Sequence, residues 1–324
     1  MAFPTETVYG LGVHALDRAA VRRLFEAKGR PSSDPLIVHV ASLDAARDLL
    51  AEVPAAAYAL AERFWPGPLT LVMRRSSAVP DEVTAGLGTV AIRVPAHPVA
   101  RALIEAAAIP VAAPSANLFS RPSPTRASHV LDDLDGRIDL IVDGGPTQVG
   151  VESTVLDLSR PTATILRPGA VTLGMLRDVL PGVVERQPSQ AADNEAQPSP
   201  GLLSKHYAPR TPLTVYRGTP AAAKAHLISD AAGLAKTGSR LVLIACSEEL
   251  AEILAVLGPS APRAISLGSS TDLTSVSQRL YAALREADAA GANDILMVDA
   301  LAGDGFADAI RDRITRAATT IHRV

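Results

Sequence analysis

The stretch "AKGRPSSDPLIVHV", residues 27–40, joins a helix, a stiff loop and a strand, and this junction indicates the fold of the region around it. The helical pattern is predicted to end at Lys28, and Gly29 is a suitable C-terminal cap. Two prolines stiffen the loop, and residues 36–40 have the apolar composition of a strand. A helix followed directly by a buried strand is typical of an α/β arrangement.

The loop of this stretch carries two cations, Lys28 and Arg30, with no acid between them. A compact ammonium beside a planar guanidinium is the pairing expected for a polyphosphate rather than for a single carboxylate. The alternative is a solvated cationic helix end that interacts with the helix dipole. Lys28 is the only lysine before residue 205, which favours an anion clamp.

Upstream of the clamp, residues 3–12 have the sequence "FPTETVYGLG". Thr5, Thr7 and Tyr9 alternate with other residues, and two glycines follow. The alternation predicts a strand that runs into a turn beside a ligand.

The first 185 residues mix strand and helix patterns without an internal repeat, which predicts a twisted mixed sheet with helices, of the α/β or α+β class. The strand patterns are residues 36–40, 69–73, 89–94, 140–144 and 153–158, and the clearest helix patterns are residues 17–28 and 96–108.

A simpler pattern begins at residue 213. Apolar runs at 212–216, 241–246, 264–268 and 295–301 are separated by Ala- and Leu-rich stretches of helical length. This β-α unit, repeated four times, predicts a small parallel sheet covered by helices. The segment before it is rich in Pro, Gln and Ser and has the composition of a linker. The sequence therefore predicts a first domain at 1–185, a linker at 186–212 and a second domain at 213–324.

Composition narrows the class of protein. A length of 324 residues suggests two domains, and 48% hydrophobic with 20% charged residues indicates that most of the chain folds. No apolar run is long enough for a membrane span, and the N-terminal residues lack the pattern of a signal peptide. A single cysteine, Cys246, fits a reducing cytoplasm. A net charge of -3 argues against an extended nucleic-acid footprint.

Two charged or titratable residues interrupt predicted strands. Arg93 lies in an apolar strand, and a buried guanidinium needs an anion, which either the protein or a ligand could supply. His39 ends the strand at 36–40, where a histidine is more often a satisfied core residue than a ligand-binding one.

The stretch "PVAAPSANLFSRPSPT", residues 110–125, is the strongest local feature. A short apolar strand ends at Pro114 and is followed by Ser115, Asn117 and Ser123 on a rigid turn. Hydroxyl and amide groups in this position are typical of a nucleotide or phosphate loop. The same residues could instead cap the next helix. The chain has no P-loop motif, no G-x-S-x-G nucleophile motif and no zinc-type Cys/His spacing.

Taken together, these segments resemble the threonylcarbamoyl-AMP synthase family of the longer type, over nearly the whole chain. The segments that carry the resemblance are "FPTETVYGLG", "KGRPSSDPLIVHV", "WPGPLTLV", "VAIRVPAHP", "PVAAPSAN", "GVESTVLDL", "LRPGAV" and "SPGLLSKHYAP". The resemblance implies a YrdC-like domain joined to a smaller Rossmann-like domain.

The resemblance also implies an activity. Members of this family condense L-threonine, bicarbonate or carbon dioxide, and ATP into threonylcarbamoyl-AMP and pyrophosphate, with Mg²⁺ bound to ATP. Another complex then transfers the threonylcarbamoyl group to tRNA, so direct tRNA binding by this chain is expected to be weak. The linker, with Tyr207, would act as a lid over the site.

Site residues follow from the resemblance, motif by motif. Those implied for threonine are Thr7, His39, Arg93 and Ser153. Those implied for ATP are Lys28, Arg30, Asp34, Thr89, Ser115, Asn117, Ser123, Arg167 and Tyr207. Among the latter, the residues implied for catalysis are Lys28, Arg30, Ser115 and Asn117.

The chain departs from the family pattern at two points. Relatives carry an added helix and strand before the "PTETVYG" segment, and Asp34 stands where an amide is expected.

The alternative functions are an RNA-binding module or a non-catalytic YrdC-like module. Balanced charge and an aromatic content of 3% oppose the first, and the intact K-x-R and S-x-N motifs oppose the second.

Overall fold

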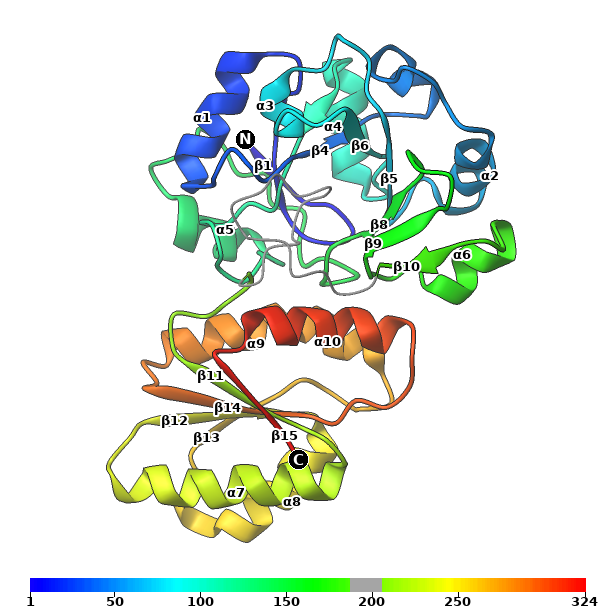
Figure 1. The fold of residues 1–324 in the computed structure, drawn as a ribbon. Coiled ribbons are helices and arrows are strands. Elements are labelled where there is room, and N and C mark those ends of the chain that lie inside the picture. Colours follow the sequence, from blue (N-terminus) through cyan, green and yellow to red (C-terminus); the bar gives the residue numbers. More distant parts are fainter. Residues whose placement is uncertain (187–205) are drawn as a thin grey trace. The chain divides into compact units, whose positions relative to one another are not determined.

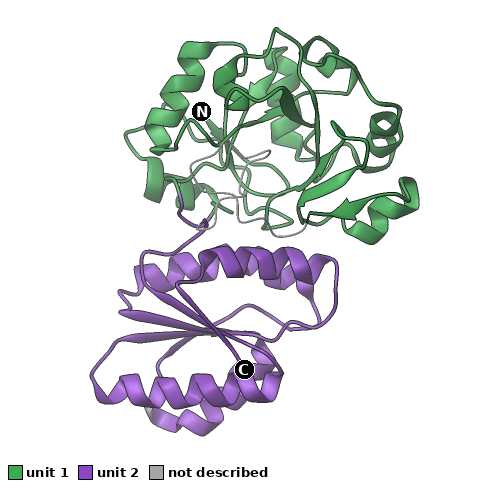
Figure 2. Ribbon diagram, in the orientation of Figure 1, with its two compact units in different colours: residues 1–119, 123–204 green, residues 120–122, 205–324 purple. Residues whose placement is uncertain are grey.

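The structure is a computed structural model that describes residues 1–186 and 206–324. It divides into two compact units, residues 1–119 with 123–204 and residues 120–122 with 205–324 (Figure 2). Residues 187–205, which are most of the linker predicted at 186–212, lie outside the described residues. Among the described helices, none is long and apolar enough to cross a membrane.

In the described part of the first unit, eight strands form one sheet that mixes parallel and antiparallel pairs, as the sequence predicts (Figure 1). In sheet order the strands are β10 (Val184–Glu185), β9 (Thr164–Arg167), β8 (Thr154–Asp157), β5 (Leu69–Arg74), β6 (Thr89–Arg93), β4 (Ile37–His39), β7 (Val111–Ala112) and β3 (Val13–His14). A separate antiparallel pair is formed by β1 (Ala2–Phe3) and β2 (Gly10–Leu11).

Helix α1 (Arg18–Lys28) begins and ends as its sequence predicts. The side chain of Asp17 accepts the first free N–H groups of the helix, and Gly29 adopts the left-handed conformation at φ 62°. The helix thus delivers Lys28 and Arg30 to the loop before β4. The other described helices of this unit are η1 (Asp44–Leu49), α2 (Ala55–Phe64), α3 (Asp81–Thr84), α4 (Pro98–Ala107), α5 (Ala127–Leu134) and α6 (Leu173–Val179).

The strand predicted from the alternation at Thr5, Thr7 and Tyr9 is wrong. The hydroxyl of Thr5 accepts hydrogen bonds from the N–H groups of Thr7 (3.2 Å) and Val8 (3.3 Å) and donates to the Val8 carbonyl (2.6 Å). A side chain that bonds to its own backbone in this way replaces the ladder of a sheet with a turn.

The strand predicted at residues 140–144 is also wrong. Ile141 makes only an isolated bridge with Ala2, through bonds from the Ala2 N–H to the Leu140 carbonyl and from the Val142 N–H to the Ala2 carbonyl. Since β1 ends at Phe3 and the chain then turns, too little backbone lies beside this run to continue a ladder.

In the second unit, the described residues form a five-stranded parallel sheet in the order β13-β12-β14-β11-β15. Helices α7 and α8 cover one face and α9 and α10 the other, so the predicted Rossmann-like arrangement is confirmed (Figure 1). The bounds are β11 (Leu213–Arg217), α7 (Pro220–Lys236), β12 (Leu241–Ala245), α8 (Ser247–Leu257), η2 (Gly258–Ser260), β13 (Arg263–Ser266), α9 (Leu273–Ala289), β14 (Asp294–Asp299), α10 (Phe306–Ala317) and β15 (Thr320–Arg323).

Strand β15 has no counterpart among the predicted strands. It lies at the edge of the sheet, and three of its four residues are exposed. An edge strand of this kind needs no apolar run, whereas the other strands of this sheet are predicted by their apolar runs.

Gly169 is a position where the fold leaves no room for a side chain. A Cβ built there would lie 2.4 Å from the backbone nitrogen of Thr154 and 2.8 Å from the carbonyl carbon of Ser153. We expect Gly169→Ala to lower stability by about 1–3 kcal/mol, because the start of β8 must move to admit the methyl group. Thermal unfolding measures this effect. The matched control is Gly182→Ala, whose Cβ would meet nothing within 4 Å; equal melting temperatures for the two variants would contradict the prediction.

Candidate active site

Four polar side chains come from four neighbouring strands or their ends in the middle of the mixed sheet. His39 and Arg93 end the adjacent parallel strands β4 and β6 and are partners in register. Thr70 lies near the start of β5, and Ser153 directly precedes β8, the next strand in the sheet. All four are buried. Polar groups gathered at one place in an apolar sheet mark a candidate ligand site.

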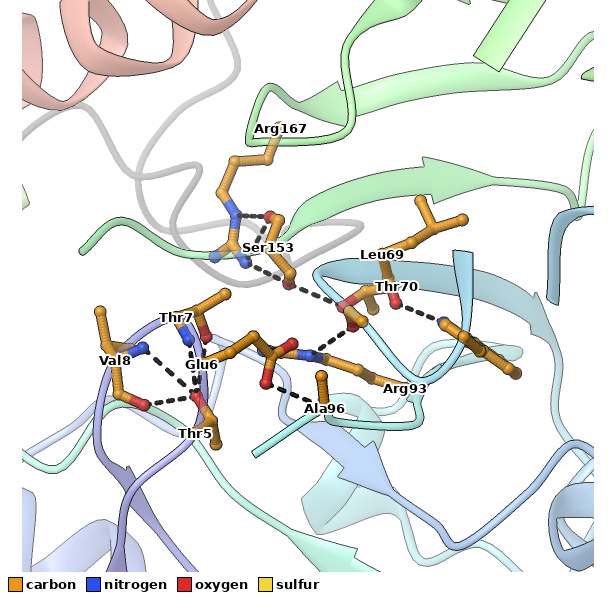
Figure 3. Close-up of polar contacts among 12 residues, drawn as sticks. Thr5, Glu6, Thr7, Val8, Leu69, Thr70, Arg93, Ala96, Ser153 and Arg167 are labelled. Atoms are coloured by element: carbon orange, nitrogen blue, oxygen red, sulfur yellow. Dashed lines mark hydrogen bonds and ion pairs between the residues drawn. The ribbon is translucent and has the colours of Figure 1, made fainter. Parts of the chain in front are cut away.

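The anion that pairs with Arg93 is a side chain of the protein, that of Glu6. Nη2 of Arg93 donates to Oε1 of Glu6 at 2.5 Å, and both side chains are 4% exposed. The other carboxylate oxygen of Glu6 accepts the Ala96 N–H at 2.9 Å, and Nε of Arg93 donates to the Gly67 carbonyl at 3.3 Å. Figure 3 shows the carboxylate and the guanidinium pointing toward one another. The sequence left open whether the partner of Arg93 was protein or ligand, and Glu6 is the partner in this structure.

The charge state of Glu6 follows from this pairing. Burial alone would raise its pKa, but the charge of Arg93, with the hydrogen bonds from Arg93 and Ala96, holds the pKa below its usual value of 4.5. Glu6 is therefore an anion at neutral pH, and the pair is formally neutral.

His39 is a neutral imidazole at physiological pH. Burial, followed by the nearby charge of Arg93, lowers its pKa to about 3. Its Nδ1 is buried and has no hydrogen-bond partner among the described residues. A neutral ring with an unused buried nitrogen can exchange a hydrogen bond with a ligand.

Ser153 connects Arg167 with Thr70. The Ser153 and Thr70 hydroxyls lie 2.8 Å apart, and Arg167 donates to the Ser153 carbonyl from Nε (3.2 Å) and Nη2 (3.1 Å) and to the Ser153 hydroxyl from Nη2 (3.2 Å). These contacts lie in the same close-up as the Arg93–Glu6 pair (Figure 3). The arrangement fixes the Ser153 hydroxyl between a cation and a second hydroxyl.

Lys28 and the S-x-N motif are brought together, although through the backbone of that motif. The ammonium of Lys28 donates to the carbonyl oxygens of Ser115 and Asn117, both at 2.5 Å. Burial and then the charge of Arg30 lower the pKa of Lys28 well below its usual value. A bound polyanion would oppose both effects and favour the charged form.

Arg30 and Asp34 form a second buried ion pair, with Nη2 of Arg30 2.8 Å from Oδ2 of Asp34 and side-chain exposures of 3% and 0%. Arg30 also donates to the carbonyls of Asp34 and Pro35. Asp34 therefore compensates the charge of Arg30, one of the two cations of the predicted clamp.

Three further predicted residues are Ser123, Thr89 and Tyr207. Ser123 donates to Glu152 at 2.6 Å, next to Ser153 in the chain. Thr89 lies at the opposite end of β6 from Arg93, about 13 Å away at the rise of a strand. Tyr207 belongs to the second unit and is buried, with its ring centroid 5.5 Å from that of Tyr281. The predicted roles of these residues at a nucleotide remain predictions.

Residues 7–11 connect the group formed by His39, Thr70, Arg93 and Ser153 to the S-x-N motif at 115–117. The Thr7 carbonyl accepts the Gly150 N–H at 3.1 Å, and the Tyr9 carbonyl accepts the Ala116 N–H at 2.8 Å. Gly10 then bridges to Ser115. A single segment thus ties the two groups of predicted site residues within one unit.

Glu6, Thr70 and Glu152 belong to this site and are absent from the sequence-based set. Each stands next to a predicted residue or in a quoted motif: Glu6 in "PTETVYG", Thr70 in "WPGPLTLV" and Glu152 beside Ser153. Glu6 could have been found from the sequence. A buried Arg93 requires an acid, and Glu6 is the acid next to Thr7, a residue already implied for the site.

The fold and the site define a two-domain protein whose mixed-sheet domain holds several buried cationic side chains and whose second domain is a parallel α/β sheet. The family model described as "Telomere recombination" matches residues 1–169, and the one described as "Threonylcarbamoyl-AMP synthase, C-terminal domain" matches residues 171–319. The chain belongs to the threonylcarbamoyl-AMP synthase family, an enzyme family, as the sequence resemblance predicts.

Individual relatives match along nearly the whole chain. The threonylcarbamoyl-AMP synthase of Bacillus subtilis is 44% identical over 98% of this chain and 89% of its own length. That of Pyrococcus abyssi is 40% identical over the same shares. The crystal structure of P. abyssi Sua5 complexed with L-threonine superposes with a TM-score of 0.91 at 39% identity, over 100% of this chain and 92% of that one.

The buried Arg93–Glu6 pair predicts a pH dependence of stability. Because the pKa of Glu6 is lower in the folded protein, the stabilisation is complete above the unfolded value near 4.5 and is lost as the pH falls through the folded pKa. We expect Glu6→Gln to cost about 3–5 kcal/mol at pH 7 and progressively less below pH 4.5. Melting temperatures of both proteins across this range measure the difference. The exposed control Glu105→Gln should show almost none, and a loss for Glu6→Gln that is independent of pH would contradict the assignment.

Proposed function

We propose that this protein condenses L-threonine, bicarbonate or carbon dioxide, and ATP into threonylcarbamoyl-AMP and pyrophosphate. The observation that supports this proposal best is a set of fixed cations in one unit. Lys28 contacts the S-x-N motif and Arg30 is two residues away in the chain, while Arg93 contacts Glu6 and Arg167 contacts Ser153. The first pair suits the phosphates of ATP, and Arg93 suits the carboxylate of threonine.

The reaction can proceed without a protein nucleophile. The amine of threonine attacks carbon dioxide. The N–C bond forms as one C=O π bond opens to a carboxylate, the amine proton passes to solvent, and a carbamate results. A carbamate oxygen then attacks the α-phosphorus of ATP; the new P–O bond forms as the bond to the bridging oxygen breaks, and pyrophosphate leaves. Catalysis rests on holding the reactants together and on neutralising charge at the phosphates.

The contacts of individual side chains support the roles proposed for them. Ser115 and Asn117 hold the ammonium of Lys28 in place through their carbonyls, so that it can meet a phosphate without reorganising. The Ser153 hydroxyl and the free nitrogen of neutral His39 offer hydrogen bonds to the polar groups of threonine. Thr7, on the adjoining loop, is proposed as a further contact to threonine.

Magnesium belongs to this proposal as part of the ATP substrate, with phosphate oxygens and water as its main ligands. Asp34, the carboxylate that follows the clamp, is paired with Arg30, which makes it a poor metal ligand. The product would pass to a separate complex that modifies tRNA, and direct tRNA binding and a cytoplasmic location stay predictions.

Pyrophosphate release tests the proposed function. With ATP and Mg²⁺, release should require both threonine and bicarbonate, because the carbamate must form before it can attack ATP. Omitting each in turn gives the measurement. Release that does not depend on threonine would refute the proposal, and retention of tRNA at physiological salt without any release would favour an RNA-binding module instead.

Replacement of the clamp lysine should lower the rate. We expect Lys28→Ala to reduce pyrophosphate release about 10²-fold or more, since a fixed positive charge at the phosphates is lost. Lys236→Ala, at the exposed end of α7, is the matched control and should leave the rate unchanged. Circular dichroism confirms that both variants fold; a folded Lys28→Ala protein with full activity would remove Lys28 from the site.

A further inference from the structure

We propose that Glu6 positions Arg93 for the carboxylate of the amino-acid substrate, an inference that rests on the proposed function. Glu6 and Arg93 are held at two points each: Glu6 by the guanidinium and the Ala96 N–H, and Arg93 by the carboxylate and the Gly67 carbonyl. These contacts use Nε and Nη2 of the guanidinium. Its third nitrogen, Nη1, makes no hydrogen bond with any described residue, and it is the group left for a substrate carboxylate.

Strand pairing alone does not fix this guanidinium. The register of β6 with β4 places the backbone of Arg93, but the charged group lies at the end of a long side chain with several rotatable bonds. The bond from Nε to Gly67, at 3.3 Å, is the longer of the two contacts. The 2.5 Å contact with Glu6 is the one that sets the orientation of the guanidinium plane.

Glu6 is itself anchored through its backbone. Its carbonyl accepts the Val149 N–H at 2.7 Å, and the next carbonyl, that of Thr7, accepts the Gly150 N–H. The loop that carries Glu6 is thus tied to the segment that leads to Ser153. Movement of Glu6 would therefore disturb the hydroxyl at position 7 together with the guanidinium of Arg93.

A role in proton transfer is less consistent with these contacts. Each carboxylate oxygen of Glu6 already accepts a charged or backbone donor, and the pairing with Arg93 lowers its pKa. A carboxylate of this kind is a weak proton acceptor. Glu6 therefore acts through Arg93 rather than on the reacting atoms, and it also spares the protein an uncompensated buried cation.

Substrate kinetics of Glu6→Ala test this role. We expect the KM for threonine to rise about tenfold or more, as for a lost charged hydrogen bond, while the KM for ATP and kcat stay within about twofold. The dissociation constant of threonine, measured by calorimetry without ATP, should rise in parallel. Glu105→Ala, which breaks an exposed ion pair on α4, is the matched control and should change none of these values.

Other outcomes would overturn the inference. An unchanged threonine KM in folded Glu6→Ala would mean a structural role only. A fall in kcat with unchanged KM would make Glu6 a reacting group, and a lower KM would mean that Glu6 competes with the substrate for Arg93. If Glu6→Ala does not fold, Glu6→Gln serves, because its amide oxygen can satisfy Arg93 or Ala96 but not both, and the same rise in KM is expected.

A double variant separates an effect through Arg93 from a direct one. If Glu6 acts through the guanidinium, Glu6→Ala with Arg93→Ala should bind threonine no more weakly than Arg93→Ala alone. Additive losses would overturn the proposal. If the wild-type protein binds threonine but releases no pyrophosphate, the proposed function fails while this binding test still stands.

Discussion

A guanidinium in the middle of a β-sheet must have an anion, and much of the first unit is organised around that requirement. Arg93 ends a strand with apolar neighbours, and the anion reaches it from a loop 87 residues earlier in the chain. To deliver Glu6, the N-terminal segment must turn rather than continue as a strand, which the Thr5 hydroxyl accomplishes. The same turn places Thr7 beside the pair and leads on to the S-x-N motif.

The buried cations of the site are stabilised in two different ways. Arg93 and Arg30 are each paired with a protein carboxylate, whereas Lys28 is held by two backbone carbonyls. Carbonyl dipoles stabilise an ammonium without cancelling its charge, so Lys28 keeps more of its attraction for an anion than a paired arginine does. Each group is also oriented before a ligand arrives, which lowers the cost of binding.

The sequence predicts the features that depend on neighbouring residues, and it does not predict those that depend on contacts between distant parts of the chain. The second unit follows from local periodicity, and only the polar edge strand β15 escaped. The α1 cap at Gly29 is equally local. Glu6 and Thr70 could not be assigned in this way, because their roles depend on contacts with Arg93 and Ser153 from distant parts of the chain. Asp34 stands where an amide is expected, and its pairing with Arg30 in the folded loop accounts for an acid at this position.

The carboxylates that make the site stable also limit what it can attract. An unpaired Arg93 would draw any anion strongly but would be costly to bury, while a fully neutralised one would offer no group to a substrate. The observed geometry lies between these extremes, since Glu6 uses one amino group of the guanidinium and leaves Nη1 without a partner among the described residues. Such a site discriminates by the direction of a hydrogen bond more than by net charge, which suits a zwitterionic amino acid, and neutral His39 adds no further charge.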